Sequence, residues 1–235
     1  MSIARKSIIT IFLILLIDQL IKIFIKTGMF LYQDIPVFGN WFIIKFIENN
    51  GMAFGVDLPG DYGKLVLSIF RIIAIIAIIF YMRHLIRDKA PNGLLISMSF
   101  ILAGAIGNIL DSAFYGIIFN ESTPFAKATL FPEEGGYSSF LHGKVVDMFY
   151  FPLIQGTWPG WVPYFGGNYF EFFRPVFNLA DSVISLGVFS ILIFQKRFFV
   201  KEVVDQLTEG PKEQNTDQSF SGPTEEGETK TDIIP

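Results

Sequence analysis

The sequence contains no cysteine and only two histidines. The first absence excludes disulfide bonds and any thiolate chemistry supplied by the chain itself. The second leaves few of the side chains that usually hold a transition metal, so we expect no metal site. We also expect no organic cofactor. The sequence also lacks a glycine-rich nucleotide-binding motif and a basic patch, and we therefore expect no nucleic-acid partner.

Charged residues are scarce as well. They make up 17% of the chain, whereas 51% of the residues are hydrophobic and the mean hydropathy is +0.47; an average soluble domain has about 25% charged residues. The net charge of −4 is unevenly distributed, because residues 202–235 hold nine acidic and two basic residues, a net −7, and the rest of the chain carries +3. We interpret residues 1–201 as a membrane domain. Residues 202–235 read as a disordered acidic cytoplasmic tail, because they have too few apolar side chains to build a core.

Four apolar runs are long enough to cross the hydrocarbon core of a bilayer, which takes about 20 residues. They cover approximately residues 8–25, 65–82, 94–110 and 176–194. The first run follows Arg5 and Lys6 like a signal peptide, but it is long and no small-residue cleavage site follows it, so we expect it to stay uncleaved. The sequence predicts an all-α membrane protein with four transmembrane helices.

Basic residues in the short flanks indicate the orientation of these helices. If all four runs span the membrane, these residues fall on one side; they are Arg5, Lys6, Arg83, Arg87, Lys89, Lys196, Arg197 and Lys201. By the positive-inside rule both termini are then cytoplasmic. Two longer stretches, about 26–63 and 112–175, fall on the other side. The alternating apolar residues of "VFGNWFIIKFIEN" predict a small β-containing extracytoplasmic subdomain there.

Polar residues interrupt the first and third runs. Asp18 and Lys22 are four positions apart on one helix face, where they could neutralise each other. We favour an ion pair that orients the first helix over a direct part in chemistry. Asn108 and Asp111 also share a face, and Gly104 would let another backbone approach closely. Packing explains the glycine, but it does not explain the acid.

Two further acidic residues lie near the predicted outer boundary of the membrane. Asp147 precedes an apolar and aromatic patch, and Asp181 lies in the fourth run on the same face as Asn178. A carboxylate in such a run serves an ion or proton pathway about as often as it serves catalysis. Two carboxyls close together would share a proton, as in an aspartic protease, where one takes a proton from water and the other donates one to the scissile carbonyl. This pairing favours catalysis.

Five short motifs occur in order along the four runs: "DQLIK", "NNGMAFG", "GAIGNILD", "GKVVDM" and "FNLADSVI". Together they resemble the lipoprotein signal peptidases, or signal peptidase II, of bacteria. The resemblance implies a four-helix intramembrane aspartyl endopeptidase of the bacterial cytoplasmic (inner) membrane, with its site near the extracytoplasmic face. It also implies substrates: diacylglyceryl-modified prolipoproteins, cut just before the lipidated cysteine. Membrane lipids are the other expected partners, and we expect a monomer.

Carried over position by position, the resemblance makes Asp147 and Asp181 the catalytic pair. The other matching positions are Asp18, Lys22, Asn49, Gly51, Ala53, Phe54, Gly104, Asn108, Asp111, Asn178 and Ala180. We expect Asn49, Gly51, Asn108, Asp111, Asn178 and Ala180 to bind substrate or support the pair, with Asp111 mainly structural. Asp18 and Lys22 are expected to position the first helix.

The sequence also departs from the family pattern. The family usually has arginine after the acid of the third-run motif, where this chain has Ser112, and Met148 stands where phenylalanine is common. The stretches 112–143 and 147–181 are longer than in typical members and could form an extra outer subdomain or a lid. We expect Arg71, in the second run, to reach toward the outer interface, with contact to substrate carbonyls or lipid as the alternative.

Two other classes of function fit the intramembrane acids. A small proton-coupled transporter or channel could use Asp18, Asp111 and Asp181 as a relay, but the runs lack the paired interrupted segments of inverted-repeat transporters. A noncatalytic assembly factor would use the acids for helix packing alone. Cleavage of a substrate by the purified protein separates these classes.

Overall fold

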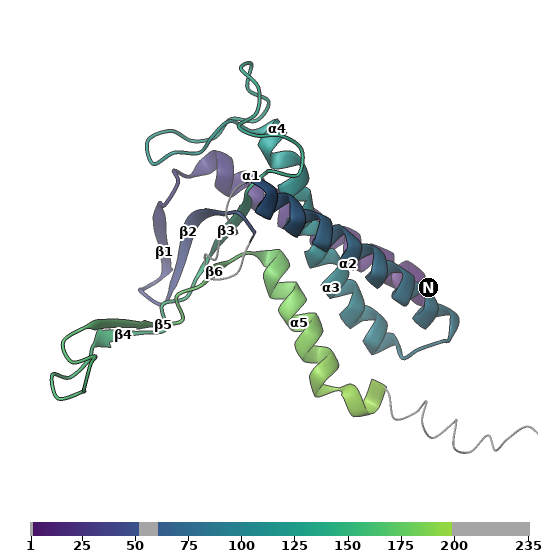
Figure 1. Ribbon diagram of the computed structural model, residues 1–235. Coiled ribbons are helices and arrows are strands. Elements are labelled where there is room, and N and C mark those ends of the chain that lie inside the picture. The colour runs from purple at the N-terminus through teal and green to yellow at the C-terminus, as the bar shows by residue number, and fades with distance from the viewer. Residues whose placement is uncertain (1, 52–60, 199–235) are drawn as a thin grey trace, which may run out of the picture. The chain divides into compact units, whose positions relative to one another are not determined.

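The computed structural model describes residues 2–51 and 61–198 (Figure 1). The helices of this part are α1 (Ile3–Gly28), α2 (Asp61–Arg87), α3 (Asn92–Leu110), the π-helical segment η2 (Asp111–Tyr115), α4 (Gly116–Ile118) and α5 (Leu179–Ile193). Its strands are β1 (Asp34–Phe38), β2 (Phe42–Asn49), β3 (Val145–Tyr150), β4 (Ile154–Thr157), β5 (Tyr169–Phe172) and β6 (Val176–Phe177). The predicted tail 202–235, together with Ala53 and Phe54, lies outside the described residues.

Beyond its first turns, helix α1 has its charged residues inside and many of its apolar residues outside. Asp18, Lys22 and Lys26 recur every fourth position and are almost fully buried, whereas Phe12 and Phe24 are 61% and 73% exposed. In a water-soluble protein this arrangement would expose a large apolar patch. Around a bilayer it is the expected one, because lipid solvates the apolar side chains and the polar groups pair inside.

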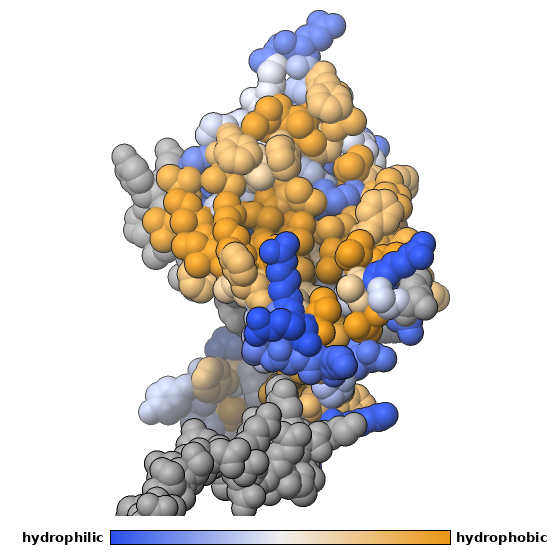
Figure 2. Space-filling view, turned by 90° about the vertical axis from the view of Figure 1, so that its right-hand side faces the viewer, coloured by the Kyte–Doolittle hydropathy of each residue, from blue (hydrophilic) through white to orange (hydrophobic). Residues whose placement is uncertain are grey.

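Three helices in the described part of the chain are long and apolar enough to cross a membrane: Ile3–Gly28, Gly63–Arg87 and Asn92–Ile118. The face shown in Figure 2 is largely apolar over the helices, with hydrophilic residues gathered in clusters. These helices contain the first three predicted runs. The third continues beyond the predicted end at residue 110, because η2 and α4 extend it to Ile118. The stretch that was predicted to begin outside the membrane at residue 112 therefore begins as helix.

The fourth predicted run starts differently from the prediction. Residues 176–177 form strand β6, and helix α5 begins only at Leu179 and ends at Ile193, which gives it 15 residues. Asn178 caps the helix with its side chain, which accepts a hydrogen bond from the backbone N–H of Asp181. Asn178 therefore precedes the helix, so the prediction that it shares a helix face with Asp181 is wrong.

A four-stranded antiparallel sheet in the order β1-β2-β3-β6 lies at one end of the helices (Figure 1). Strand β2 pairs with β3 so that Asn49 lies opposite Val145 and Ile47 opposite Asp147. Strand β6 leads directly into α5. The sheet thus brings the end of β2, the middle of β3 and the start of α5 together. The β-containing region was predicted for residues 26–63, but β3 comes from the later outer stretch and β6 from the start of the fourth predicted run.

Strands β4 and β5 form a separate hairpin that projects away from the four-stranded sheet (Figure 1). It lies within the long stretch between Asp147 and Asp181. From the sequence, this stretch could form either an extra subdomain or a lid. In the structure this stretch is a two-stranded extension whose second strand connects to β6 through residues 173–175.

Helices α3 and α5 pack closely along their length. A methyl group added at Gly104 would lie 2.3 Å from the carbonyl oxygen of Ala180 and 2.6 Å from Cγ1 of Ile184. Only glycine permits this approach, as the sequence predicted for Gly104. The contact sets the first turn of α5, which carries Asp181, against the end of α3, which carries Asn108.

Candidate active site

A cleft of about 250 Å³ lies where the sheet meets the helices. It is lined by Asn49, Gly51, Arg71, Asn108, Val145, Asp147, Pro175, Val176, Phe177 and Asp181. The two acidic residues that the sequence proposed as a pair thus line the same cleft, although 34 positions of chain separate them. One comes from a strand and the other from the first turn of a helix, so the fold alone unites them.

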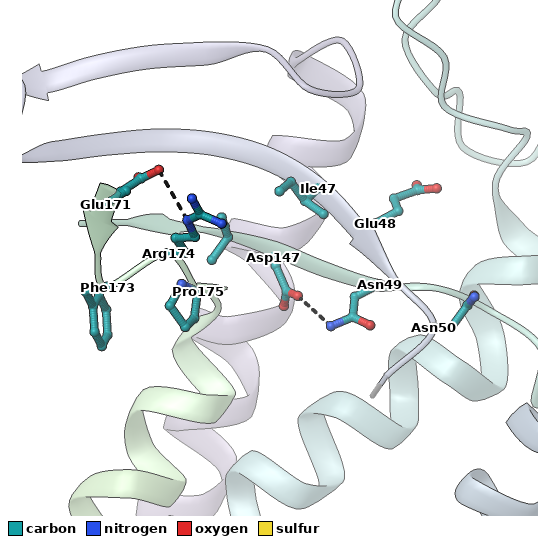
Figure 3. Close-up of a pocket in the computed structure, with 10 residues that line it drawn as sticks. Ile47, Glu48, Asn49, Asn50, Asp147, Glu171, Phe173, Arg174 and Pro175 are labelled. Atoms are coloured by element: carbon teal, nitrogen blue, oxygen red, sulfur yellow. Dashed lines mark hydrogen bonds and ion pairs between the residues drawn. The ribbon is translucent and has the colours of Figure 1, made fainter. Parts of the chain in front are cut away.

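Asp147 lies in the middle of β3 and is only 3% exposed. Its carboxyl accepts hydrogen bonds from two carboxamide groups: Nδ2 of Asn49 donates to Oδ2 at 3.2 Å and Nδ2 of Asn178 donates to Oδ1 at 2.7 Å. Figure 3 shows the side chains of Asp147 and Asn49 directed at each other from neighbouring strands. Burial, and then the charge of Asp181, raise the pKa of Asp147 from an ordinary 3.8 to about 7. The group can therefore hold a proton near neutral pH.

Asp181 is the third residue of α5 and is half-buried. It forms a capping box with Asn178, in which each side chain accepts a hydrogen bond from the backbone N–H of the other residue. The remaining oxygen, Oδ1, accepts a hydrogen bond from Nδ2 of Asn108 at 2.8 Å. The helix start therefore fixes this carboxylate, and α3 orients it.

Lys22 determines how these amide groups are oriented. An ammonium group only donates, so its contact of 3.1 Å with Asn108 requires the amide oxygen of Asn108 to face it. The NH₂ group of Asn108 then faces Asp181. The same oxygen also accepts from Nδ2 of Asn178, which leaves the oxygen of Asn178 for the backbone N–H of Asp181. One buried cation thus fixes the direction of every hydrogen bond between these side chains.

Lys22 and its two acidic partners join α1 to the rest of the bundle. The ammonium lies 3.0 Å from Asp18 and 2.8 Å from Asp111, and all three side chains are at most 1% exposed. Asp18 also accepts a hydrogen bond of 3.0 Å from the backbone N–H of Ala180, which ties α1 to the first turn of α5. The predicted Asp18–Lys22 ion pair is therefore confirmed in the structure, and it reaches further than orienting one helix.

Asp111 does not contact the two acids of the cleft. One of its oxygens accepts from Nε2 of Gln19 at 2.9 Å, and the other accepts from the backbone N–H of Val146 at 3.4 Å, next to Asp147. It lies at the start of the π-helical segment η2, and such segments occur frequently at functional sites. Asp111 thus connects α1 and α3 to β3, which agrees with a supporting role. The sequence reasoning gave Gln19 no role, although it lies inside the "DQLIK" motif.

Arg71 and Gly51 form the wall of the cleft toward α2. The guanidinium of Arg71 donates to the carbonyl oxygen of Gly51 and interacts electrostatically with Asp181, Asp111 and Asp147. Gly51 has a φ of +93°, a conformation that residues with a side chain rarely adopt, and an added methyl group would also lie 2.6 Å from the guanidinium of Arg71, so glycine is strongly favoured here. Arg71 thus lines the cleft and donates to a protein carbonyl. The prediction that its side chain reaches toward the outer interface did not indicate this position.

A second buried ion pair involves Glu48, the residue before Asn49 in β2. Lys26 pairs with Glu48 and donates to the hydroxyl of Ser122 at 2.9 Å, and it also lies over the ring of Phe119 at 5.3 Å. It joins the end of α1 to β2 directly beside Asn49. Sequence reasoning missed it because the partners are distant along the chain. Lys26 is one helical turn beyond Lys22, which was the available signal.

The remaining predicted positions are placed as follows. Ser112, which stands where the family usually has arginine, is buried and donates to the carbonyl oxygen of Asn108 at 3.2 Å. Its own carbonyl accepts from the backbone N–H of Gly143, so the returning loop occupies this side of η2. Within residues 2–51 and 61–198, no group of three or more histidine, aspartate or glutamate residues is arranged to hold a metal ion.

The chain is similar to proteins that are already known. The chain is 48% identical to the lipoprotein signal peptidase of Porphyromonas gingivalis, over 85% of this chain and 84% of that protein. It is 37% identical to the lipoprotein signal peptidase of Amoebophilus asiaticus, over 83% of this chain and 78% of that protein. Two solved structures of bacterial membrane enzymes have the same fold. They are 24% and 23% identical, with TM-scores of 0.51 and 0.52, and cover 80% and 88% of this chain and 90% and 93% of theirs.

The profile of the signal peptidase (SPase) II family matches residues 10–199, which is most of the chain and includes both acids of the cleft. The long apolar helices and the fold of these relatives make it a multi-pass membrane protein. The chain therefore belongs to the signal peptidase II family.

Proposed function

We propose that the protein is an intramembrane aspartyl endopeptidase that removes the signal peptide from diacylglyceryl-modified prolipoproteins and cuts before the lipidated cysteine. The observation that carries the proposal is one cleft lined by Asp147 and Asp181, with carboxamide donors on both carboxyls. Membership of the signal peptidase II family supports the same substrate class and does not favour a transporter.

The chemistry follows from the raised pKa of Asp147. Asp147 carries the shared proton, and Asp181 acts as the general base that takes a proton from water. The hydroxyl oxygen adds to the scissile carbonyl while Asp147 protonates the carbonyl oxygen, which gives a neutral tetrahedral diol. Asp181 then returns its proton to the nitrogen of the cysteine, the C–N bond breaks, and the diol proton returns to Asp147. The pair ends as it began, with one proton.

Arg71 and the asparagines would hold the substrate in register with this pair. The guanidinium already contacts one carbonyl, that of Gly51, and it lies beside both acids. A substrate carbonyl entering the cleft would meet the same donor. Positioning of this kind contributes a large share of rate enhancement when the reacting atoms are held in line.

The membrane arrangement is part of the proposal. We place four helices across the bacterial inner membrane, with α5 as the fourth, both termini in the cytoplasm and the cleft near the extracytoplasmic face. The basic residues after α2 and after α5 support this orientation. The 15 residues of α5 would span about 22 Å, and strand β6 would complete the crossing on the outer side. The protein would act as a monomer together with lipid.

The test is cleavage by the purified protein in nanodiscs. We expect a lipobox peptide whose cysteine carries a diacylglyceryl group to be cut on the amino side of that cysteine, and its unlipidated counterpart to be cut far more slowly. Product analysis by mass spectrometry identifies the bond. Equal cleavage of both peptides would contradict the substrate class, and the absence of any cleavage of the lipidated peptide would contradict the proposed activity.

A further inference from the structure

A second and larger cavity adjoins the cleft. It has a volume of about 890 Å³ and is lined by Ile47, Glu48, Asn49, Asn50, Asp147, Glu171, Phe173, Arg174, Pro175 and Val176 (Figure 3). We call it the outer pocket. Its volume lies within the range of ~300–1,000 Å³ that is typical of ligand sites. Asp147 and Asn49 line both cavities, so the outer pocket begins at one of the two acids of the cleft.

The far wall of the outer pocket comes from the end of the projecting hairpin. Strand β5 supplies Glu171, and the connection to β6 supplies Phe173 and Arg174. These residues belong to the stretch between Asp147 and Asp181 that is longer than in typical members of the family. The pocket is therefore formed partly by this long stretch, and it adjoins the cleft that holds the two acids.

The two charged side chains of this wall, Glu171 and Arg174, make few close polar contacts within the described residues. Glu171 and Arg174 approach to 3.9 Å, a long ion pair, and the side chain of Arg174 is 69% exposed. The carboxylate of Glu171 is largely buried, and its Oε1 has no hydrogen-bond partner within the described ranges 2–51 and 61–198. A buried carboxylate oxygen without a donor is unfavourable. A ligand with N–H groups would satisfy it, and the carbonyl oxygens of such a ligand would satisfy the guanidinium.

The proposed substrate has three parts, and only one matches these walls. The signal peptide is an apolar helix, and the acyl chains are hydrocarbon; both are solvated well by lipid and would gain nothing beside a carboxylate and a guanidinium. The polypeptide that follows the cysteine is polar and leaves the membrane. It offers main-chain N–H and C=O groups in alternation, which suits a wall that presents one acceptor and one donor together with the apolar faces of Phe173 and Pro175.

From this match we propose that the outer pocket binds the first residues of the mature polypeptide, those directly after the lipidated cysteine, with Glu171 accepting from a main-chain N–H and Arg174 donating to a main-chain carbonyl. The inference rests on the proposed peptidase function. It makes the hairpin a specificity element on the leaving-group side of the scissile bond. Catalysis remains with Asp147 and Asp181.

The first test varies substrate length and pocket residues together. Diacylglyceryl-cysteine peptides that end directly after the cysteine or six residues later, both with C-terminal amides, are compared in nanodiscs. We expect the longer peptide to have a kcat/KM about tenfold higher with the unaltered protein, which corresponds to roughly one or two good hydrogen bonds. Glu171→Gln and Arg174→Gln should reduce this ratio severalfold, and the control Glu134→Gln, an exposed acid elsewhere in the insertions, should preserve it.

A ratio near one with the unaltered protein, or a ratio unchanged in both pocket variants, would overturn the inference while leaving the peptidase function intact. The absence of cleavage of either peptide would instead overturn the proposed function. The two failures are therefore distinguishable.

The second test does not depend on how the pocket variants fold. A lipidated peptide with a photoreactive side chain two residues after the cysteine is bound to the Asp181→Asn protein, which is expected to hold substrate without cutting it. We expect crosslinks to map to residues 171–176. Crosslinks confined to other segments would contradict the assignment, whatever the kinetic result.

Discussion

The direct hydrogen-bond donors to Asp147 are the amides of Asn49 and Asn178, which carry no net charge. A lysine or arginine at this distance would favour the ionised form of the carboxyl. Amides orient it without neutralising it, so burial and the repulsion from Asp181 remain in effect and the group keeps its proton near pH 7. The nearby cations make their direct contacts with other groups: Lys22 contacts Asp18 and Asp111, and Arg71 donates to the carbonyl oxygen of Gly51.

A prediction about pH follows at this scale. Because the pair needs one proton, we expect kcat/KM to fall as the pH rises through about 7, where Asp147 loses its proton. The measurement is the pH profile of lipopeptide cleavage between pH 5 and 9 in nanodiscs. A rate that stays constant across neutral pH would contradict Asp147 as the proton-carrying member.

The raised pKa of Asp147 also predicts how the melting temperature of the Asp147→Asn variant depends on pH. The pKa of Asp147 is raised above the ordinary 3.8, so between pH 3.8 and about 7 the folded protein holds a proton that the unfolded chain has released. The protonated carboxyl of Asp147 therefore favours the folded state fully below pH 3.8, and this stabilisation is lost as the pH rises to about 7. Asp147→Asn should therefore melt at a higher temperature than the unaltered protein at pH 8, with a smaller difference at pH 5.

Sequence and structure agree unevenly for individual residues. Asp147, Asp181, Asn49 and Asn108 could be selected from motifs and from the cost of placing polar groups in apolar runs. The hydrogen bond from Asn178 to Asp147 could not be predicted in this way, because it depends on strand β6 ending at Phe177, directly before the helix cap Asn178. The spacing Asn-x-x-Asp of a capping box was present in the sequence, but the apolar residues before it concealed the helix start.

At the scale of elements, the contact between α3 and α5 determines whether Asn108 can reach Asp181. Gly104 lies opposite the carbonyl of Ala180, so any side chain there would push the two helices apart. We expect Gly104→Ala to destabilise the protein by about 1–3 kcal/mol, as overpacking usually does. It should also reduce cleavage, because the Asn108–Asp181 hydrogen bond lengthens.

The matched control for this variant is Gly28→Ala at the end of α1. An added methyl group there meets no atom within 4 Å. Both variants are compared for melting temperature in detergent and for kcat. Equal behaviour of the two variants would contradict the role assigned to the α3–α5 contact.

The helices and the sheet differ in how far the sequence predicts them. The helices follow from apolar runs of membrane length, since their backbone hydrogen bonds must be satisfied within the segment. The β-containing region was predicted from alternation in 26–63, but its strand β2 pairs with β3, about 100 residues further along the chain, and β3 in turn pairs with β6. Such pairing depends on tertiary contacts that a local pattern does not encode.

At the scale of the whole molecule, polar groups gather where the helices meet the sheet, and the outward faces of the helices remain apolar. This distribution explains why a chain with so few charges buries several of them. The buried ion pairs of Lys22 and Lys26 join α1 to η2 and to β2. The two carboxylates paired with Lys22 also accept hydrogen bonds from the backbone N–H groups of Ala180 and Val146, each next to one acid of the cleft.

We propose that Asp147 and Asp181 act as one catalytic unit in lipoprotein processing. The most direct measurement is cleavage of a diacylglyceryl-modified lipobox peptide in nanodiscs by Asp147→Asn, by Asp181→Asn and by the control Asp34→Asn, an exposed acid of the same sheet. We predict that each of the first two variants inserts and folds normally and loses at least about 10³-fold in kcat/KM, and that the control retains full activity. Turnover close to that of the unaltered protein in either well-folded variant would contradict the account.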